Sequence, residues 1–305
     1  MVSASHKARL SIAKVGTIGV AVAFVSYAVV VFNIKPALAA RSIINGLTIS
    51  AAHEPAGRID ALIEELKKGE GYSTFGTTEI REQANQIGNA QLQDQAIAGQ
   101  DKQKYLKFVI EEMEKQRKEE PTDVRAMAFI ANAYSTAGRY QDAINAIDDA
   151  LKISTRRQQF YFVAAEAYLG LNNPGKAVET LKTAYELDPA YDEAVHNYVI
   201  VLLLLKRTNE AENIYEKRFG SKDLAQPRYA AIYARNGDFN GALRTWRKLL
   251  EGYPKNAEYH AGLGGLYFQM GNKRDAIAEF QKAIEFEPRF KERGEEIIKQ
   301  IEASK

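Results

Sequence analysis

The sequence of 305 residues predicts an all-α protein, a solenoid of helical hairpins preceded by a single membrane-spanning helix. Two observations carry this prediction. A stretch of twenty residues near the N-terminus contains no charged side chain, and the pattern Tyr-x8-Ala-x3-large then recurs along the chain at a spacing close to 34 residues. Hydrophobic residues make up 46% of the sequence, which is enough to bury the cores of such hairpins.

The uncharged stretch covers residues 15–34, between Lys14 and Lys35. At about 1.5 Å per residue, a helix of this length spans about 30 Å, which matches the hydrocarbon core of a bilayer. An uncleaved anchor is favoured, because the apolar regions of signal peptides are usually only about 7–15 residues long. Two alternatives stay open: a signal peptide cleaved after Ala37-Leu38-Ala39, and a buried helix of a soluble protein.

The charges beside this stretch predict its orientation. Residues 1–14 contain Lys7, Arg9 and Lys14, against Lys35 and Arg41 on the other side. The positive-inside rule then places a basic N-terminus in the cytoplasm and the rest of a single-pass protein outside the cell membrane.

Residues 36–120 are predicted to form a helical juxtamembrane region. Pro36 is expected in the first turn of a helix leaving the membrane. A run rich in glutamine and asparagine at 83–95 could be a flexible linker, but its apolar residues keep the helical period and favour a helix. The expected helices are 36–52, 55–68, a helix from Glu79 capped by Thr78, and 104–120, of which the first two could pair as a hairpin.

Five repeats follow between residues 124 and 290. Their positions are marked by Tyr134, Tyr168, Leu202, Tyr233 and Tyr267, each followed nine residues later by alanine. The repeats resemble the tetratricopeptide repeat family, whose pattern W-x2-L-G-x2-Y…A-x3-F…P matches in all but its first aromatic residue. The resemblance implies a superhelix of paired helices. The turn inside four of the hairpins is expected at residues that accept a left-handed backbone, namely Gly138, Asn172, Gly237 and Gly271.

Small residues recur where the two helices of each hairpin must approach closely, for example Ala165 with Ala177. The third repeat is three residues short, because Leu202 and Tyr233 are 31 residues apart. A compressed second helix or a tighter connection is expected around residues 219–223. Residues 291–305 carry isoleucines on one side and are predicted to form a capping helix over the last hairpin.

A second resemblance involves two short segments before the repeats. Asn33-Ile34-Lys35-Pro36 and the segment 75–82 are similar to the junction between the last membrane helix and the repeat-bearing tail of O-antigen ligase/polymerase-like proteins. This resemblance implies an accessory or detached C-terminal part of a protein that assembles cell-surface glycans, with a polytopic membrane protein as partner. The many membrane spans on which glycan transfer depends in that family are missing, so transferase activity is not carried over.

Composition argues against an enzyme. The chain has no cysteine and four histidines, none at the spacing of metal ligands, and it contains no phosphate-binding loop or nucleophile motif. Residues 36–305 carry a net charge of −2, which excludes a basic nucleic-acid face. No catalytic, cofactor or metal residues are therefore predicted.

The favoured function is that of a membrane-anchored, non-catalytic scaffold that binds a protein or peptide in a groove formed by the first helices of the repeats. The middle of this groove is apolar and is predicted to receive an apolar segment of the partner. The alternative that Leu203 and Leu204 are covered by the neighbouring repeat stays open. The predicted groove residues are Arg125, Asn132, Phe162, Glu166, Leu169, His196, Ile200, Leu203, Arg235 and Phe268.

Overall fold

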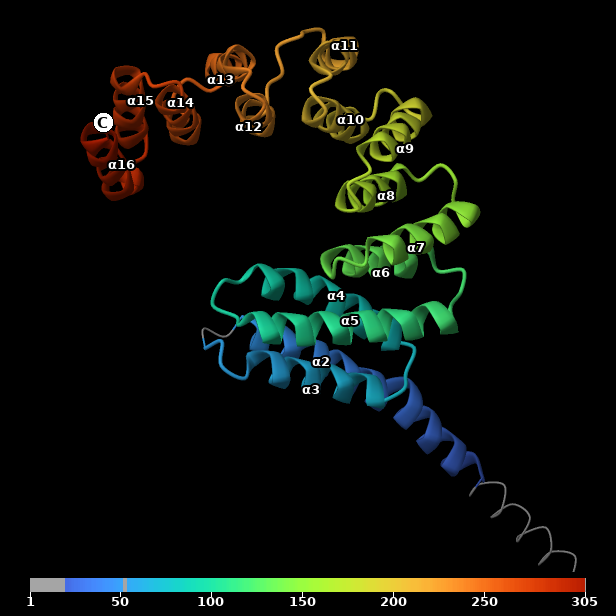
Figure 1. Cartoon of the computed structure of the whole chain (residues 1–305). Coiled ribbons are helices and arrows are strands. Elements are labelled where there is room, and N and C mark those ends of the chain that lie inside the picture. Colours follow the sequence, from blue (N-terminus) through green and yellow to red (C-terminus); the bar gives the residue numbers. More distant parts are fainter. Residues whose placement is uncertain (1–19, 52–53, 305) are drawn as a thin grey trace, which may run out of the picture. The chain divides into compact units, whose positions relative to one another are not determined.

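The computed structural model describes residues 20–51 and 54–304 (Figure 1). Among these residues there is no strand, and 81% of them are helical, which confirms the all-α prediction. The helices fall into two compact units, unit 1 up to Thr155 and unit 2 from Arg156.

Unit 1 begins with the apolar helix. One continuous helix runs from Val20 to Ser50, and it is long and apolar enough to cross a membrane. The basic segment 1–14 and the first five residues of the predicted span 15–34 lie outside the described residues.

The prediction that Pro36 lies in the first turn of a helix is confirmed, because α2 (Lys35–Ser50) begins one residue before it. The chain is nevertheless helical without a break from Val20 through this residue, so α2 continues the apolar helix. A π-helical turn, η1 (Val30–Ile34), ends two residues before the proline. Proline lacks an N–H group and its ring crowds the carbonyl four residues earlier. A wider turn at this point relieves both conflicts without ending the helix.

The C-terminal part of this helix, α2, and the next three helices of unit 1 form two antiparallel pairs that pack together. The predicted pairing of the first two is present: Asn45 on one donates to Glu65 on the other at 3.0 Å, and Gly46 approaches Leu62 closely. The glutamine-rich run is helical, with Ile80, Ala84 and Ile87 buried. The helices of unit 1 are α2 (Lys35–Ser50), α3 (Arg58–Gly71), α4 (Thr77–Gln93), α5 (Gly99–Glu119), α6 (Val124–Thr136) and α7 (Tyr140–Ile153).

A charged cluster lies between α3, α4 and α5. Arg81 is buried at its centre, 2.8 Å from Glu70 and 2.6 Å from Glu119. The carboxylate of Glu112 is also buried, and one of its oxygens has no hydrogen-bond donor. Burial, together with a hydrogen bond to Glu112, raises the pKa of Glu70 to about 7.

The five predicted repeats are five hairpins, α6–α7 in unit 1 and four in unit 2. All four predicted turn residues have a positive φ, and so does Lys206, which was not predicted. The residue after each turn residue donates its backbone N–H to the carbonyl of the tyrosine or leucine that marks the repeat. Arg139, for example, donates to Tyr134 at 2.8 Å. The helices of unit 2 are α8 (Gln158–Gly170), α9 (Pro174–Leu187), α10 (Asp192–Leu204), α11 (Thr208–Phe219), α12 (Pro227–Arg235), α13 (Phe239–Gly252), α14 (Ala257–Gln269), α15 (Lys273–Phe286), η2 (Pro288–Phe290) and α16 (Lys291–Ala303).

The shortened spacing has a different origin from the one expected. Helix α11 has 12 residues where the other second helices have 14, as predicted. The connection 220–226 is longer than in the other repeats, not tighter, and the main loss is in α12, which has 9 residues against 13 in the other first helices. Pro227 sets this late start, because proline fits the first turn of a helix and cannot continue an earlier one.

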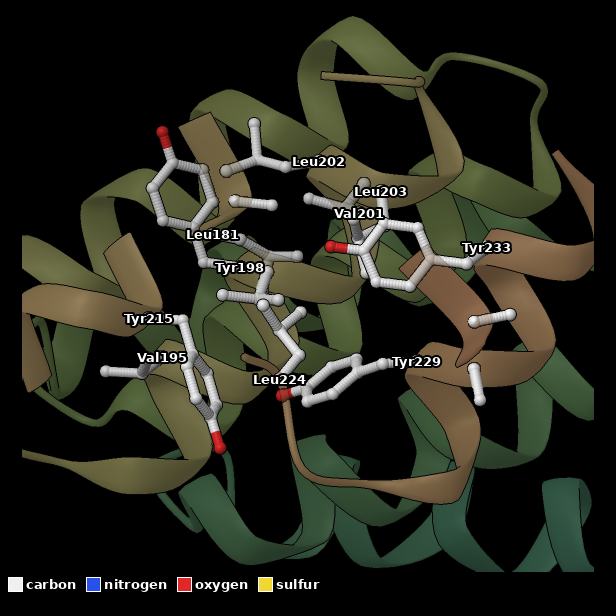
Figure 2. Packing of buried hydrophobic residues seen from close by; sticks show 14 of the residues in the cluster. Leu181, Val195, Tyr198, Val201, Leu202, Leu203, Tyr215, Leu224, Tyr229 and Tyr233 are labelled. Carbon is white, nitrogen blue, oxygen red and sulfur yellow. The ribbon is translucent and has the colours of Figure 1, made fainter. Parts of the chain in front are cut away.

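A continuous core runs through unit 2 from α8 to α14. Figure 2 shows its middle part, from Leu181 to Tyr233. Its largest side chains come from consecutive repeats, among them Leu202, Tyr229 and Tyr233. At the end of the unit, α16 packs on α15 with Ile301 buried, as expected of a capping helix.

Candidate partner-binding face

The first helices of unit 2 form a continuous row, because α8, α10, α12 and α14 each contact the next. We call the exposed side of these four helices the first-helix face. It is the surface that tetratricopeptide-like hairpins present when they stack, and most of the predicted groove residues belong to it.

A cleft of about 180 Å³ opens on this face between α12 and α14. Its lining consists mainly of alanine and glycine, with the ring of Trp246 from α13 among them. A β-carbon at Gly262 would stand 2.4 Å from that ring, so the glycine is what allows the indole to lie against α14. The residues lining the cleft are Ala230, Ala231, Ala234, Trp246, Ala261, Gly262, Gly265, Leu266 and Gln269.

Gly265 differs from Gly262 in its surroundings. A β-carbon at this position would meet nothing within 4 Å, so the space in front of it is open. Glycine in the middle of a helix costs about 0.5–1 kcal/mol relative to alanine. Gly265 is therefore unfavourable for helix stability, but it keeps the cleft open, because any larger side chain at this position would fill part of it.

A larger cleft, of about 640 Å³, lies between α14, α15 and α16 and shares Ala261 and Gly262 with the smaller one. Phe280 and Phe290 form apolar parts of its wall. Arg289 and Arg293 are exposed at its edge. The two clefts meet at Ala261 and Gly262, so small residues form the surface of the first-helix face between them.

The apolar groove residues predicted on α8 and α10 are only partly exposed for contact with a partner. Phe162 is half-buried and stacks on Tyr191 at a ring distance of 6.3 Å, and Ile200 is half-buried against the core. Leu169 is 36% exposed. These side chains could contact a partner through the surface they leave uncovered.

Leu203 does not belong to the groove. Its side chain is 0% exposed and lies in the core of unit 2 (Figure 2). The alternative reading of the sequence, that the neighbouring repeat covers it, is the correct one for this residue. The side chain of Asn236 on the next hairpin also donates to the Leu203 carbonyl at 2.6 Å.

His196 is part of an aromatic cluster at the junction of two hairpins. Its ring stacks on Phe219 at 5.2 Å, and its Nδ1 is 2.5 Å from the Tyr229 hydroxyl. Gln226 is also within hydrogen-bond distance of the imidazole. Burial, with the charge of Arg228, lowers the pKa of His196. The neutral imidazole therefore joins α10 to α12, and its role is structural.

The remaining predicted residues fall into two groups. Arg125 and Asn132 belong to unit 1, where Arg125 forms an ion pair with Glu82 at 3.1 Å. In unit 2 the exposed members are Glu166, Arg235 and Phe268.

The sequence reasoning did not identify Gly265 or the exposed edge of Trp246 as parts of the face. A usable signal was present, because the helix 257–269 contains three glycines at 262, 264 and 265. Glycine is unfavourable inside helices, so three glycines within four consecutive residues indicate positions where a side chain would not fit or where open space is kept.

Comparison with known proteins agrees with this architecture. A family profile described as tetratricopeptide repeat matches residues 130–192 and 230–289, and a second profile of the same description matches 168–235. The crystal structure of a tetratricopeptide repeat protein from Parabacteroides merdae ATCC 43184 is similar over 86% of this chain and 99% of its own, with a TM-score of 0.51 and 17% identity. At this identity the likeness concerns the fold alone.

Two curated proteins match parts of the chain. The BBSome complex member BBS4 of Bos taurus is 25% identical over 114 residues, which are 37% of this chain and 22% of that protein. The TPR repeat-containing protein YpiA of Bacillus subtilis (strain 168) is 17% identical over 200 residues, which are 64% of this chain and 47% of that protein. The chain therefore spans about a fifth and about half of these relatives. The profile matches begin at residue 130 and do not reach the segments that resemble O-antigen ligases.

Proposed function

The chain belongs to the tetratricopeptide repeat family through residues 130–289, more than half of its length, and from this we propose that it is a non-catalytic scaffold. Repeats of this family generally bind protein partners. The partner of this chain is a protein or peptide that docks on the first-helix face of unit 2, and the chain is held at the membrane by its N-terminal helix.

The observation that carries the proposal is the cleft between α12 and α14. Stacked hairpins normally fill the space between neighbouring helices with side chains, as the buried core of unit 2 does. Here Ala231, Ala234, Ala261 and Gly265 leave that space open at the surface. An apolar side chain of a partner fits such a site, because the lining offers mostly methyl groups and the indole of Trp246.

Membrane anchoring is supported by the helix Val20–Ser50, whose apolar window has a mean hydropathy of 1.7 and no buried residues. A helix with an uncovered apolar surface needs an apolar environment, and a bilayer supplies one. The basic residues before it favour a cytoplasmic N-terminus, which would leave both units outside the cell membrane.

The binding proposal is tested with Gly265→Leu. Because nothing lies within 4 Å of a β-carbon at this position, the leucine fills the cleft without disturbing the fold. Affinity capture from native membranes in mild detergent should recover the partner with the wild-type chain and lose it with this variant. Two controls, Gly265→Ala and Gln281→Leu at an exposed position of α15, should retain capture.

Equal capture by all variants would contradict binding at this cleft, provided that circular dichroism shows them folded. Recovery of a polytopic membrane protein as the partner that Gly265→Leu loses would support a role in glycan assembly.

The anchor and its orientation are tested separately. Protease added to spheroplasts should digest both units, and N-terminal sequencing should recover residue 1 or 2. A mature N-terminus at Ala40 or Arg41 would instead establish a cleaved signal peptide.

A further inference from the structure

The most exposed large hydrophobic side chain among the described residues is Phe75, in the connection between α3 and α4. It is 78% exposed, more than any residue of the apolar helix, where Val20 reaches 72%. Single exposed apolar residues are common on protein surfaces and need no explanation by themselves. Phe75 differs from such single residues in two respects: the position of its loop in unit 1, and the uncharged, internally hydrogen-bonded structure of that loop.

The loop lies at the end of unit 1 from which the apolar helix leaves. Helices α2 and α3 are antiparallel, because Asn45 bonds to Glu65 and a β-carbon at Gly69 would stand 2.9 Å from that of Ser42. Following both helices for one more turn toward the membrane span places Ser73 beside Leu38. Leu38 lies about 5 Å along the axis of α2 from Lys35, the residue that follows the predicted span. Figure 1 shows the connection between α3 and α4 at the end of the unit where the N-terminal helix enters α2.

The loop is also suited to a lipid surface. The eight residues from Gly71 to Thr78 carry no charge. Their backbone is internally bonded: Ser73 donates to the Glu70 carbonyl at 2.8 Å, and Thr77 donates to that of Thr74 at 3.1 Å. Polar backbone groups that are already paired lower the cost of leaving water.

We propose that the loop Tyr72–Gly76 rests in the interfacial layer of the membrane, with the Phe75 ring inserted at the boundary of the acyl chains. The inference rests on the membrane anchoring proposed above and adds a second point of contact with the bilayer. Interfacial segments bury phenylalanine, tryptophan and leucine at the boundary between headgroups and acyl chains, and tyrosine, present here as Tyr72, is enriched at the interface. The helix and the loop together fix the tilt of unit 1 against the membrane, which a single helix would leave free.

The test uses the absence of cysteine from the chain. Single cysteines replace Phe75, Gln95 or Val25 in the full chain, each is labelled with an environment-sensitive fluorophore, and the protein is reconstituted in phosphatidylcholine vesicles. Nitroxide lipids then quench the fluorophore, with the nitroxide either on the headgroup or at carbon 12 of an acyl chain. Gln95 is the matched control, because it is exposed in the connection at the opposite end of α4, about 25 Å away.

The expected result is at least twofold quenching at Phe75→Cys by headgroup nitroxide, little quenching at Gln95→Cys, and strongest quenching at Val25→Cys by the carbon-12 nitroxide. If Val25→Cys reports lipid while Phe75→Cys is quenched no more than Gln95→Cys, the anchor stands and the docking of the loop is refuted. If Val25→Cys reports water, the anchor and the docking both fail. Phe75 makes too little contact with the rest of the chain for its replacement to unfold unit 1.

Discussion

The indole of Trp246 lies against the backbone of Gly262 on the neighbouring hairpin, with no room for a β-carbon between them. The tryptophan thereby closes one side of the cleft between α12 and α14. Two glycines of the same helix, at 262 and 265, thus have opposite roles: one admits a side chain of the protein, and the other leaves space unfilled.

This difference predicts opposite effects of the same substitution. Gly262→Ala should destabilise unit 2 by about 1–3 kcal/mol, because the new methyl group overlaps the Trp246 ring. Gly265→Ala should stabilise it by about 0.5–1 kcal/mol, because alanine favours the helix and meets no neighbour. Urea denaturation followed by Trp246 fluorescence measures both, and equal midpoints for the two variants would contradict the packing described.

The stability of unit 2 should fall on mild acidification. Burial lowers the pKa of His196, so below its ordinary value of 6.5 the unfolded chain binds a proton that the folded unit does not yet accept. Arg228 acts in the same direction, while Asp192 and Glu193 oppose it. Thermal unfolding monitored by Trp246 fluorescence between pH 7 and 5.5 provides the measurement.

The matched variant for this prediction is His196→Asn, which keeps a hydrogen-bonding side chain but cannot titrate. Its midpoint should change less with pH than that of the wild type over the same range. An identical pH dependence in both proteins would mean that His196 does not cause the effect.

Unit 1 should respond to pH in the opposite sense. The pKa of Glu70 is raised to about 7, so between pH 4.5 and 7 the folded unit holds a proton that the unfolded chain releases. This contribution is present at low pH and is lost as the pH rises through about 7, at a cost on the order of 2 kcal/mol. Hydrogen exchange in α3–α5, corrected for intrinsic rates, should show more frequent opening at pH 8 than at pH 5.

Glu70→Gln serves as the control, because the amide is neutral at every pH and has nearly the same shape. The variant should lose most of the difference between pH 5 and pH 8. A difference of unchanged size would exclude Glu70 as its source.

The close approach inside the hairpins predicts the effect of a larger side chain. Ala177 is fully buried between the helices of the second repeat. Ala177→Leu should overpack this site and cost about 1–3 kcal/mol, whereas Lys182→Leu at an exposed position of the same helix should cost little. Equal denaturation midpoints for the two variants would show that the repeat register is wrong.

The hairpins were predictable because each is specified by short-range rules. A marker residue, a turn residue with a left-handed backbone and an alanine nine residues after the marker all fall within one repeat, so the pattern is legible without the rest of the chain. Lys206 was missed because lysine rarely adopts this backbone, and only the repeat geometry forces it to do so.

The candidate site was less predictable, because exposure depends on what the next hairpin covers. Leu203 occupies the same repeat position as Leu169, yet the following hairpin buries one and leaves the other 36% exposed. The next hairpin contacts Leu203, whose carbonyl accepts a hydrogen bond from Asn236, and no local pattern around Leu203 encodes this contact. Pro36 shows a similar limit, since proline predicts a boundary while the π-helical turn that accommodates it has no sequence signature.

The long connection between α11 and α12 has a consequence for how unit 2 unfolds. Repeat arrays behave as chains of neighbours, and an irregular junction is where such a chain would be expected to separate into independent segments. Here Leu224 of the connection is buried in the core beside Tyr229 (Figure 2), and the backbone N–H of Ala225 donates to the Tyr215 hydroxyl at 3.3 Å. The junction is thereby filled with apolar contacts that belong to the hairpins on both sides. Unit 2 should consequently unfold as one cooperative block, so that unfolding of its first hairpin also lowers the stability of its last hairpin.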